Sequence, residues 1–327
     1  MEIVNLNGCA PSWRYYGGAA GRKEGILIDG EPWIAKFPRT TRDMTGKHLP
    51  SYTSSPVSEH IGSRVFASLG IPVHETFLGF FQGRIVCACK DFTFPDAQLV
   101  EFNKLKNSTP DDLPAASGSL SDGDSTYLAD VLASISCVAP LTTVEGVIER
   151  FWDMFVVDAF IKNPDRNNGN WGLLRSTDGA FSLAPVYDNG SCLFNKRTPS
   201  VAAARLANEG AIEEDAFGTN VSCYKIVDPA SGTAHAIHPF EYMMTSANPD
   251  LDDAIVRIAE HMNMEAVCAI VDSIPREAYG TVVMPDAMRE SHKRLFEERY
   301  EHGIVPAAAA ARERIAARQQ RKALGTF

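Results

Sequence analysis

Three polar residues in the middle of the chain have the types and the spacing that phosphoryl transfer requires. Asp165 and Asn170 stand five residues apart in the segment FIKNPDRNNGNWGLL, and Asp188 precedes Gly190 by two residues in the segment YDNG. A carboxylate can orient or deprotonate an attacking hydroxyl, while carboxylate and amide oxygens are good ligands for Mg²⁺. The pattern therefore predicts Asp165 and Asn170 as catalytic residues, with Asn170 and Asp188 as magnesium ligands.

This order of residues matches the catalytic loop and the Asp-Phe-Gly element of protein kinases, with Asn163-Pro164-Asp165 in place of His-Arg-Asp. Each segment alone also fits a plain turn, because Asn-Pro-Asp-Arg and Asp-Asn-Gly are common turn sequences. The ordered set of polar residues, rather than any single one, favours the catalytic interpretation.

Residues further upstream supply groups that can hold nucleotide phosphates. Lys36 lies in WIAKFP on an expected strand, and Glu59 opens the next expected helix, so the two can form a lysine–glutamate pair. The segment YYGGAAGRKEG contains Gly17, Gly18 and Gly21, which permit a tight turn whose amides approach phosphates. We expect these five residues to bind ATP, and we expect Lys36 to be catalytic as well. A single strand lysine or a single glutamate in a first helical turn is nevertheless more often a solvated charge.

Lys90, Asp91 and Phe92 follow the last strand of the expected N-terminal sheet. In a two-lobe kinase this is the place of the hinge that contacts adenine, so these three residues are further candidates for nucleotide binding. Any other connection between two lobes would have the same place in the sequence.

The N-terminal part of the chain has the pattern of a small antiparallel sheet with one helix. Apolar and aromatic residues form four short runs, with Asp-Gly and Gln-Gly turns inside the two hairpins. The expected strands span 25–28, 32–37, 77–81 and 84–89. Between the hairpins, Ser58 can cap a helix over 59–69 that Gly70 ends.

A change in composition marks the boundary to a larger helical part. Residues 107–126 are rich in Ser, Pro, Gly and Asp without apolar periodicity, which indicates a long loop or a partly disordered segment. Beyond this segment the apolar spacing is helical. Helices are expected over 143–162, 249–262, 264–273, 286–301 and 307–324. The predicted fold class is α+β, a two-lobe protein-kinase-like fold with a small antiparallel β-sheet lobe over 1–95 that covers ATP and a larger, mainly helical catalytic lobe over 96–327.

The composition restricts the partners of the protein. The 327 residues include 31 Lys plus Arg against 41 Asp plus Glu, so the formal charge of −10 argues against duplex nucleic acid or an anionic membrane as the main partner. The basic residues of the tail could still contact nucleic acid or a protein, but a solvated helix face is the simpler expectation. They are Arg312, Arg314, Arg318, Arg321 and Lys322.

The cysteines and the hydropathy indicate a compartment. Seven scattered cysteines without a Cys-x-x-Cys pair are typical of thiols in a reducing environment rather than of disulfides or a zinc site. The start MEIVNLNG is no secretory leader, and no stretch approaches the ~18 apolar residues of a membrane span. We therefore expect a cytoplasmic protein.

The segments described above resemble the HipA-like serine/threonine kinases, and most closely the compact CtkA-like members of that family. The resemblance rests on YGGAAGRK (16–23), WIAKFP (33–38), SEHIGSRVFASLGIPV (58–73), VVDAFIKNPDRNNGNWGLL (156–174) and LAPVYDNGS (183–191). It implies that Lys36 is the ATP lysine, Glu59 its helix partner, Asp165 the catalytic aspartate, and Asn170 and Asp188 the magnesium ligands. It also implies ATP and Mg²⁺ as cofactors, a protein Ser or Thr hydroxyl as the phosphate acceptor, and an antitoxin-like protein as a possible partner.

The chain departs from the family pattern at one place. Members commonly carry a regulatory serine in or near the glycine-rich loop, whereas this loop has Ala19-Ala20 and the nearest such hydroxyl is Ser12. Two other functions stay open. One is a nucleotide-binding pseudokinase or toxin–antitoxin regulatory module that binds without transfer, and the other is a kinase for small molecules or lipids.

Overall fold

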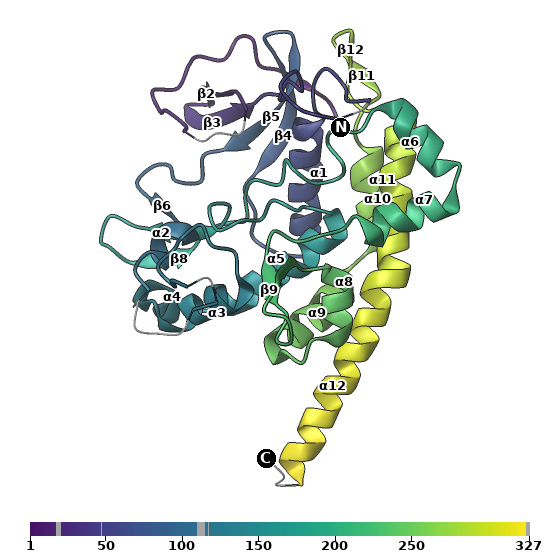
Figure 1. The fold of residues 1–327 in the computed structure, drawn as a ribbon. Coiled ribbons are helices and arrows are strands. Elements are labelled where there is room, and N and C mark those ends of the chain that lie inside the picture. The colour runs from purple at the N-terminus through teal and green to yellow at the C-terminus, as the bar shows by residue number, and fades with distance from the viewer. Residues whose placement is uncertain (18–20, 47, 110–114, 117, 325–327) are drawn as a thin grey trace. The chain divides into compact units, whose positions relative to one another are not determined.

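The structure is a computed structural model of the 327-residue chain (Figure 1). It describes residues 1–17, 21–46, 48–109, 115–116 and 118–324. The chain divides into two compact units, each built from separate segments of the sequence. The first unit contains Met1–Asp96, Pro185–Asp215 and Asn263–Glu297. The second unit contains Ala97–Ala184, Ala216–Met262 and Glu298–Phe327.

The first unit is organised around a five-stranded sheet. Its strand order is β1-β4-β5-β3-β2, with all pairs antiparallel except the parallel pair β1–β4. The strands are β1 (Val4–Asn5), β2 (Lys23–Ile28), β3 (Glu31–Lys36), β4 (Thr76–Phe81) and β5 (Arg84–Lys90). All four expected strands are confirmed, because apolar and aromatic runs broken by two-residue turns leave little alternative to hairpins.

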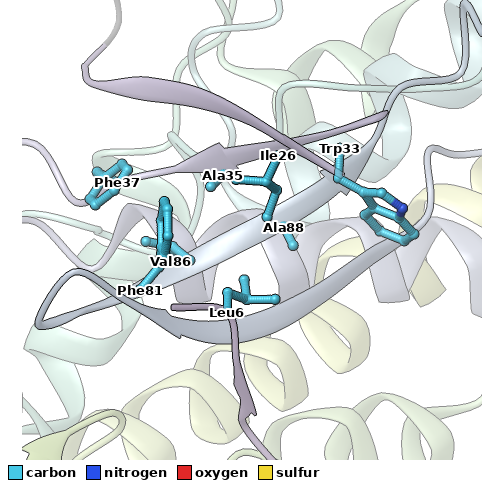
Figure 2. Close-up of a cluster of buried hydrophobic side chains, with 8 residues drawn as sticks. All are labelled: Leu6, Ile26, Trp33, Ala35, Phe37, Phe81, Val86 and Ala88. Carbon is cyan, nitrogen blue, oxygen red and sulfur yellow. The ribbon is translucent and has the colours of Figure 1, made fainter. Parts of the chain in front are cut away.

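One face of this sheet carries an apolar cluster, drawn in Figure 2. Trp33 and Ala35 alternate along β3, Phe37 directly follows that strand, and Val86 and Ala88 alternate along β5, so all five reach the same side. Leu6, Ile26 and Phe81 complete the cluster. The same alternation sends Lys36, Cys87 and Cys89 to the opposite face, which α1 covers.

Helix α1 (Ser55–Ser68) is buried along most of its length. In Figure 1 it runs beside β4 and β5, which it contacts. The helix starts earlier than expected: Ser58 lies inside it and Ser54 precedes it, since Pro56 is tolerated in a first turn. The expected end is confirmed, because Gly70 follows the helix with a left-handed φ of 75°.

The remaining elements of the first unit come from the middle and the end of the chain. They are α6 (Pro199–Leu206), α7 (Glu209–Glu213), α10 (Met264–Asp272), the short hairpin β11 (Glu277–Ala278) and β12 (Thr281–Val282), and most of α11 (Asp286–Arg299). A π-helical segment, Glu214–Gly218, follows α7. Helix α10 packs against α1.

The second unit is mainly helical. Its helices are α2 (Phe102–Lys106), α3 (Leu128–Cys137), α4 (Ala139–Thr143), α5 (Val147–Ile161), α8 (Pro239–Thr245), α9 (Pro249–His261) and α12 (Val305–Ala323). A small sheet in the order β6-β7-β8 is formed by Gln98–Glu101, Gly172–Arg175 and Phe181–Leu183, and a hairpin by β9 (Lys225–Val227) and β10 (Ala234–Ala236). A π-helical turn, Tyr300–Ile304, leads into α12.

The expected helices are present with shifted ends. Asn248 caps α9 by accepting a hydrogen bond from the amide of Leu251, as its Asn-Pro sequence predicts. The predicted helix over 143–162 is α5 and starts only at Val147, because Gly146 before it has a left-handed φ of 79°. The expected loop over 107–126 contains no helix or strand where it is described, and residues 110–114 and 117 lie outside the described residues.

The expectation of a solvated basic tail is wrong for two residues. Arg314 and Arg318 of α12 both pair with Asp252 of α9, a carboxylate with no exposed surface. Within the described residues, none of the helices is both long enough and apolar enough to cross a bilayer.

Candidate active site

Lys36 is the centre of a charged cluster in the first unit. Its Nζ lies 3.0 Å from Oε1 of Glu59 and 2.9 Å from Oδ1 of Asp188. Strand β3 presents Lys36, helix α1 presents Glu59, and Asp188 comes from the segment after β8. The predicted contact between Lys36 and Glu59 is therefore confirmed, and Asp188 joins the same group.

Burial and neighbouring charges shift the pKa values of Lys36 and Glu59 in opposite directions. Burial alone would lower the pKa of Lys36, but Asp188 and Glu59 outweigh it and raise that pKa well above its ordinary value. Burial would raise the pKa of Glu59, but Lys36 and the His74 ring lower it below the usual range. Both groups therefore stay charged at neutral pH. Of the three side chains, Asp188 is the most open, with 29% of its side chain exposed against 2% for Glu59.

The Asp188-Asn189-Gly190 segment is held against α1 rather than forming a hairpin turn. Asp188 has a left-handed φ of 61°, a conformation that Asp tolerates better than most residues. The backbone N–H of Asn189 donates to Oε1 of Glu59 at 3.2 Å. A Cβ at position 190 would lie 2.8 Å from Oε2 of Glu59, so the close approach requires Gly190.

His74 is a member of this cluster that the sequence pattern did not reveal. Its Nε2 lies 3.1 Å from Oε1 of Glu59 and 3.1 Å from Oγ of Ser63. The side-chain amide of Asn189 donates to the same Ser63 hydroxyl at 3.0 Å. Burial lowers the pKa of His74 in spite of the opposing effect of Glu59, so at neutral pH the ring is neutral. A lone histidine in the connection between α1 and β4 gives no local signal of such a role.

The loop with Asp165 and Asn170 lies in the second unit. Asp165 is exposed and follows α5. Its side chain accepts a hydrogen bond from the side-chain amide of Asn167 at 3.1 Å. Its backbone carbonyl accepts one from the side-chain amide of Asn170 at 2.5 Å. The structure thus connects Asp165 and Asn170 directly within one loop.

A buried ion pair fixes the shape of this loop. Nε and one terminal nitrogen of Arg166 donate to the two carboxylate oxygens of Asp158 at 2.9 and 3.2 Å, and the other terminal nitrogen donates to the carbonyl of Asn170 at 2.9 Å. Asn163 also donates to Asp158, at 3.0 Å. Bidentate arginine–carboxylate pairs are among the most directional contacts in proteins. In the sequence, this pair could have been suspected from Asp158, a carboxylate inside the apolar run VVDAFI at the end of a helix.

The candidate nucleotide-binding residues lie in different surroundings. Gly17 is exposed and Gly21 has a left-handed φ of 75°, while Gly18 lies outside the described residues. Asp91 accepts a hydrogen bond from the hydroxyl of Tyr16 at 2.8 Å and pairs with Arg14, so its carboxylate anchors the segment before the glycines.

The two neighbours of Asp91 have other contacts. Lys90 pairs with Glu31 at 2.6 Å, and the ring of Phe92 packs on Tyr187 with centroids 5.6 Å apart. That these residues contact a nucleotide stays a prediction.

Comparison with known proteins decides the family. A model of the HipA-like C-terminal domain matches residues 19–237. The serine/threonine-protein kinase CtkA of Helicobacter pylori strain J99 is 34% identical over 263 residues, which are 80% of this chain and 75% of that protein. The chain belongs to the HipA-like family.

A solved structure extends the similarity of this HipA-like chain to its fold. The crystal structure of a Helicobacter pylori proinflammatory kinase CtkA superposes with a TM-score of 0.84 at 29% identity, covering 95% of this chain and 98% of that one. The α+β, kinase-like fold class expected from the sequence is thereby confirmed.

The family match covers most of the candidate site of this HipA-like chain. Inside residues 19–237 lie Lys36, Glu59, Asp165, Asn170 and Asp188. Gly17 and Gly18 precede the matched region, and α12 follows it.

Proposed function

We propose that this HipA-like protein is a serine/threonine protein kinase that transfers the γ-phosphoryl group of Mg-ATP to a protein hydroxyl. The observation that supports the proposal most directly is the position of Lys36, with Nζ 3.0 Å from Glu59 and 2.9 Å from Asp188. A lysine held by a helix glutamate beside a carboxylate that can bind magnesium is the arrangement that protein kinases use for ATP phosphates.

The roles follow from the chemistry of each side chain. Lys36 supplies a fixed positive charge for the α- and β-phosphates, and Glu59 keeps it in place. Exposed Asp165 accepts the proton of the attacking hydroxyl or orients it. The Asp158–Arg166 pair acts on Asp165 only indirectly, because it fixes the loop through the carbonyl of Asn170.

Each of the two proposed magnesium ligands carries an oxygen donor suited to this ion. Asp188 offers a partly exposed carboxylate and Asn170 an amide oxygen, which are the hard oxygen donors that Mg²⁺ prefers. When bound, Mg²⁺ neutralises phosphate charge and orients the phosphates. We expect Asp188 to exchange its contact with Lys36 for the ion, which leaves Lys36 free to bind phosphate.

The remaining features of the proposal concern organisation and partners. We propose that residues 1–95 act as the ATP-covering part and residues 96–327 as the catalytic part. Gly17, Gly18, Gly21 and the segment Lys90–Phe92 would contribute nucleotide contacts. The partner is a protein substrate, with an antitoxin-like protein as a further candidate, and the acidic net charge of −10 gives no support for direct nucleic-acid binding.

Two single variants test the proposal. Asp165→Ala should abolish transfer of labelled phosphate while ATP affinity stays close to that of the wild type, because Asp165 acts on the hydroxyl. Asp188→Ala should weaken binding of Mg-ATP more than binding of metal-free ATP, since its proposed partner is the cation. Calorimetry with and without Mg²⁺, beside a radiolabel transfer assay on a cell lysate, measures both. Equal losses of Mg-ATP and ATP affinity for Asp188→Ala, or full activity of Asp165→Ala, would contradict the assignment.

A further inference from the structure

A group of three potential metal ligands, one oxygen, one nitrogen and one sulfur donor, lies beside Lys36 and includes its partner Glu59. Glu59, His74 and Cys89 are all buried, and their ligand atoms lie within 4.8 Å of one another. The three come from α1, the connection after it, and β5. Cys87 is outside this group of three, but it stands two residues before Cys89 on the same face of β5, and the two Sγ atoms are 3.8 Å apart.

Two of the separations among these side chains are close to those of a tetrahedral zinc site. Two thiolates that each lie about 2.3 Å from zinc at a tetrahedral angle are about 3.8 Å apart, which is the separation of Cys87 and Cys89. An imidazole nitrogen and a carboxylate oxygen around the same ion would be about 3.4 Å apart. Nε2 of His74 and Oε1 of Glu59 are 3.1 Å apart.

The chemistry of the ligands also suits such an ion. The contacts of the Cys89 thiol, with the carbonyl and the Sγ of Cys87 at 3.9 and 3.8 Å, are long and weak, so they offer little competition to a metal. His74 offers an imidazole nitrogen, which is a common zinc ligand. Thiolates favour Zn²⁺ and similar ions over Mg²⁺. The scattered cysteine spacing gave no sign of this group, because its members meet only across the sheet and helix.

We propose that Glu59, His74 and Cys89, with Cys87 as the fourth ligand, bind a thiophilic dication such as Zn²⁺ and thereby inhibit the kinase. Metal binding at this site does not depend on what the protein does, whereas the inhibition rests on the proposed kinase function. The metal and Lys36 compete for one carboxylate, because Oε1 of Glu59 lies 3.0 Å from Nζ of Lys36. Binding releases the two thiol protons to solvent, and Lys36 loses the partner that holds it for ATP phosphates. The neighbouring side chains of Lys36 and Asp188 are 17% and 29% exposed, so we expect the ion to enter from their side.

Cobalt reports on the site without any assay of activity. In the full chain, Co²⁺ should bind with a thiolate-to-cobalt charge-transfer absorption that Zn²⁺ abolishes at one equivalent. Cys89→Ala should lose this absorption, and its affinity for Zn²⁺ should fall by more than the ~10–100-fold that loss of an indirect partner costs. Cys87→Ala should weaken both the charge-transfer absorption and the affinity for Zn²⁺. Thermal unfolding shows whether each variant is folded, and Cys87→Ala replaces Cys89→Ala in the test if the latter does not fold. Cys268→Ala in α10 is the matched control and should behave as wild type.

Phosphoryl transfer measures the consequence. With Mg-ATP in large excess, Zn²⁺ should inhibit wild type and Cys268→Ala, while Cys89→Ala keeps its transfer activity at the same Zn²⁺ concentration. Absence of the charge-transfer band in the wild type, or its loss in Cys268→Ala alone, overturns the site. Equal inhibition of wild type and Cys89→Ala overturns the competition with Lys36. A protein that binds Co²⁺ through Cys89 but transfers no phosphate under any condition contradicts the kinase function and leaves the metal site standing.

Discussion

Three polar groups converge on one carboxylate oxygen of Glu59. Oε1 of Glu59 lies close to Nζ of Lys36, Nε2 of His74 and the backbone N–H of Asn189, at 3.0, 3.1 and 3.2 Å. One acceptor thus ties a strand, a helix and the segment with Asp188 together. A buried charge with several donors is stable only while the donors remain, because an uncompensated buried charge is costly.

This arrangement predicts that Lys36 and Glu59 act as a pair. Lys36→Met should lower phosphoryl transfer by about 10²–10³-fold, the usual cost of losing one preorganised electrostatic group. Glu59→Gln should lower it less, and the double variant should be hardly worse than Lys36→Met, because Glu59 acts through Lys36. Rates of transfer for the four proteins measure the coupling. Strictly additive losses in the double variant would mean that the pair does not act together.

Gly190 predicts a steric effect at the same carboxylate. In Gly190→Ala the new methyl group would meet Oε2 of Glu59 at 2.8 Å, and Glu59 cannot move without leaving Lys36. We expect about 1–3 kcal/mol of destabilisation, the usual cost of an overpacked site, together with reduced transfer. Gly8→Ala is the control, since no atom lies within 4 Å of its Cβ. Urea unfolding and a transfer assay compare the two, and equal stability of both variants would refute the steric argument.

At this scale, sequence reasoning finds residues whose types and order carry a signal. Lys36, Asp165 and Asp188 each stand in a recognisable segment. His74 does not, because its contact with Glu59 depends on the chain returning from α1 to β4, which no local pattern encodes. Arg166 was missed for a similar reason, since its partner Asp158 belongs to the preceding helix.

Among the elements, α1 carries an unusual number of polar groups into the interior. Ser58, Glu59, His60 and Ser63 are all buried on it. Glu59 and Ser63 reach the cluster around Lys36, whereas His60 contacts the hydroxyl of Thr76 on β4 at 3.1 Å. The helix therefore couples the site to the sheet through hydrogen bonds as well as packing.

His60 predicts an acid-sensitive contribution to stability. Burial, helped by the charge of Arg64, lowers the pKa of His60 from 6.5 to about 4. The unfolded chain then binds more protons than the folded one between these values, so stability is complete above pH 6.5 and falls towards pH 4. With ~1.36 kcal/mol per pH unit, the loss from pH 7.5 to pH 4.5 is about 2–3 kcal/mol.

The measurement is the free energy of unfolding in urea at both pH values. His60→Gln should lose less stability on acidification than the wild type by about 2–3 kcal/mol, because the other titrating groups cancel in the comparison. Thr76→Val removes the hydroxyl but keeps the imidazole, so it should retain the acid-dependent loss. The same acid-dependent loss in His60→Gln and wild type would assign the effect to other groups.

Elements with a period of two or with clear turn residues were predictable from the sequence. The hairpins β2–β3 and β4–β5 follow from alternation and from their Asp-Gly and Gln-Gly turns. The start of α1 was not, because Ser58 satisfies the pattern of a cap as well as Ser54 does. What decides between them is the burial of Pro56 and Val57, a property of the assembled unit.

For the whole molecule, each compact unit is assembled from three separate stretches of the chain. Composition and periodicity act over short windows, so they place a boundary near residue 96 but cannot show that 185–215 and 263–297 join the first stretch. The distribution of charge is equally non-local. A basic tail on a chain of net charge −10 looks like a free surface in the sequence, whereas α12 directs part of that charge inward.

The inward charge of α12 yields a final prediction about the second unit. Arg314 donates to Asp252 at 2.9 and 2.6 Å and to the carbonyls of Met243 and Met244 at 2.9 Å each, and Arg318 pairs with the same carboxylate. Removing both arginines leaves a fully buried carboxylate without its cations. Arg314→Ala/Arg318→Ala should therefore lose about 3–5 kcal/mol of stability.

Two further variants separate charge from packing in this prediction. Adding Asp252→Asn to the double variant removes the uncompensated charge at constant size, so it should recover a large part of the loss measured by urea unfolding. Arg312→Ala is the matched control on the same helix, because its pair with Glu260 is 52% and 57% exposed, and an exposed pair contributes at most about 1 kcal/mol. If Arg314→Ala/Arg318→Ala were no less stable than Arg312→Ala, α12 would be held to α8 and α9 by apolar packing alone.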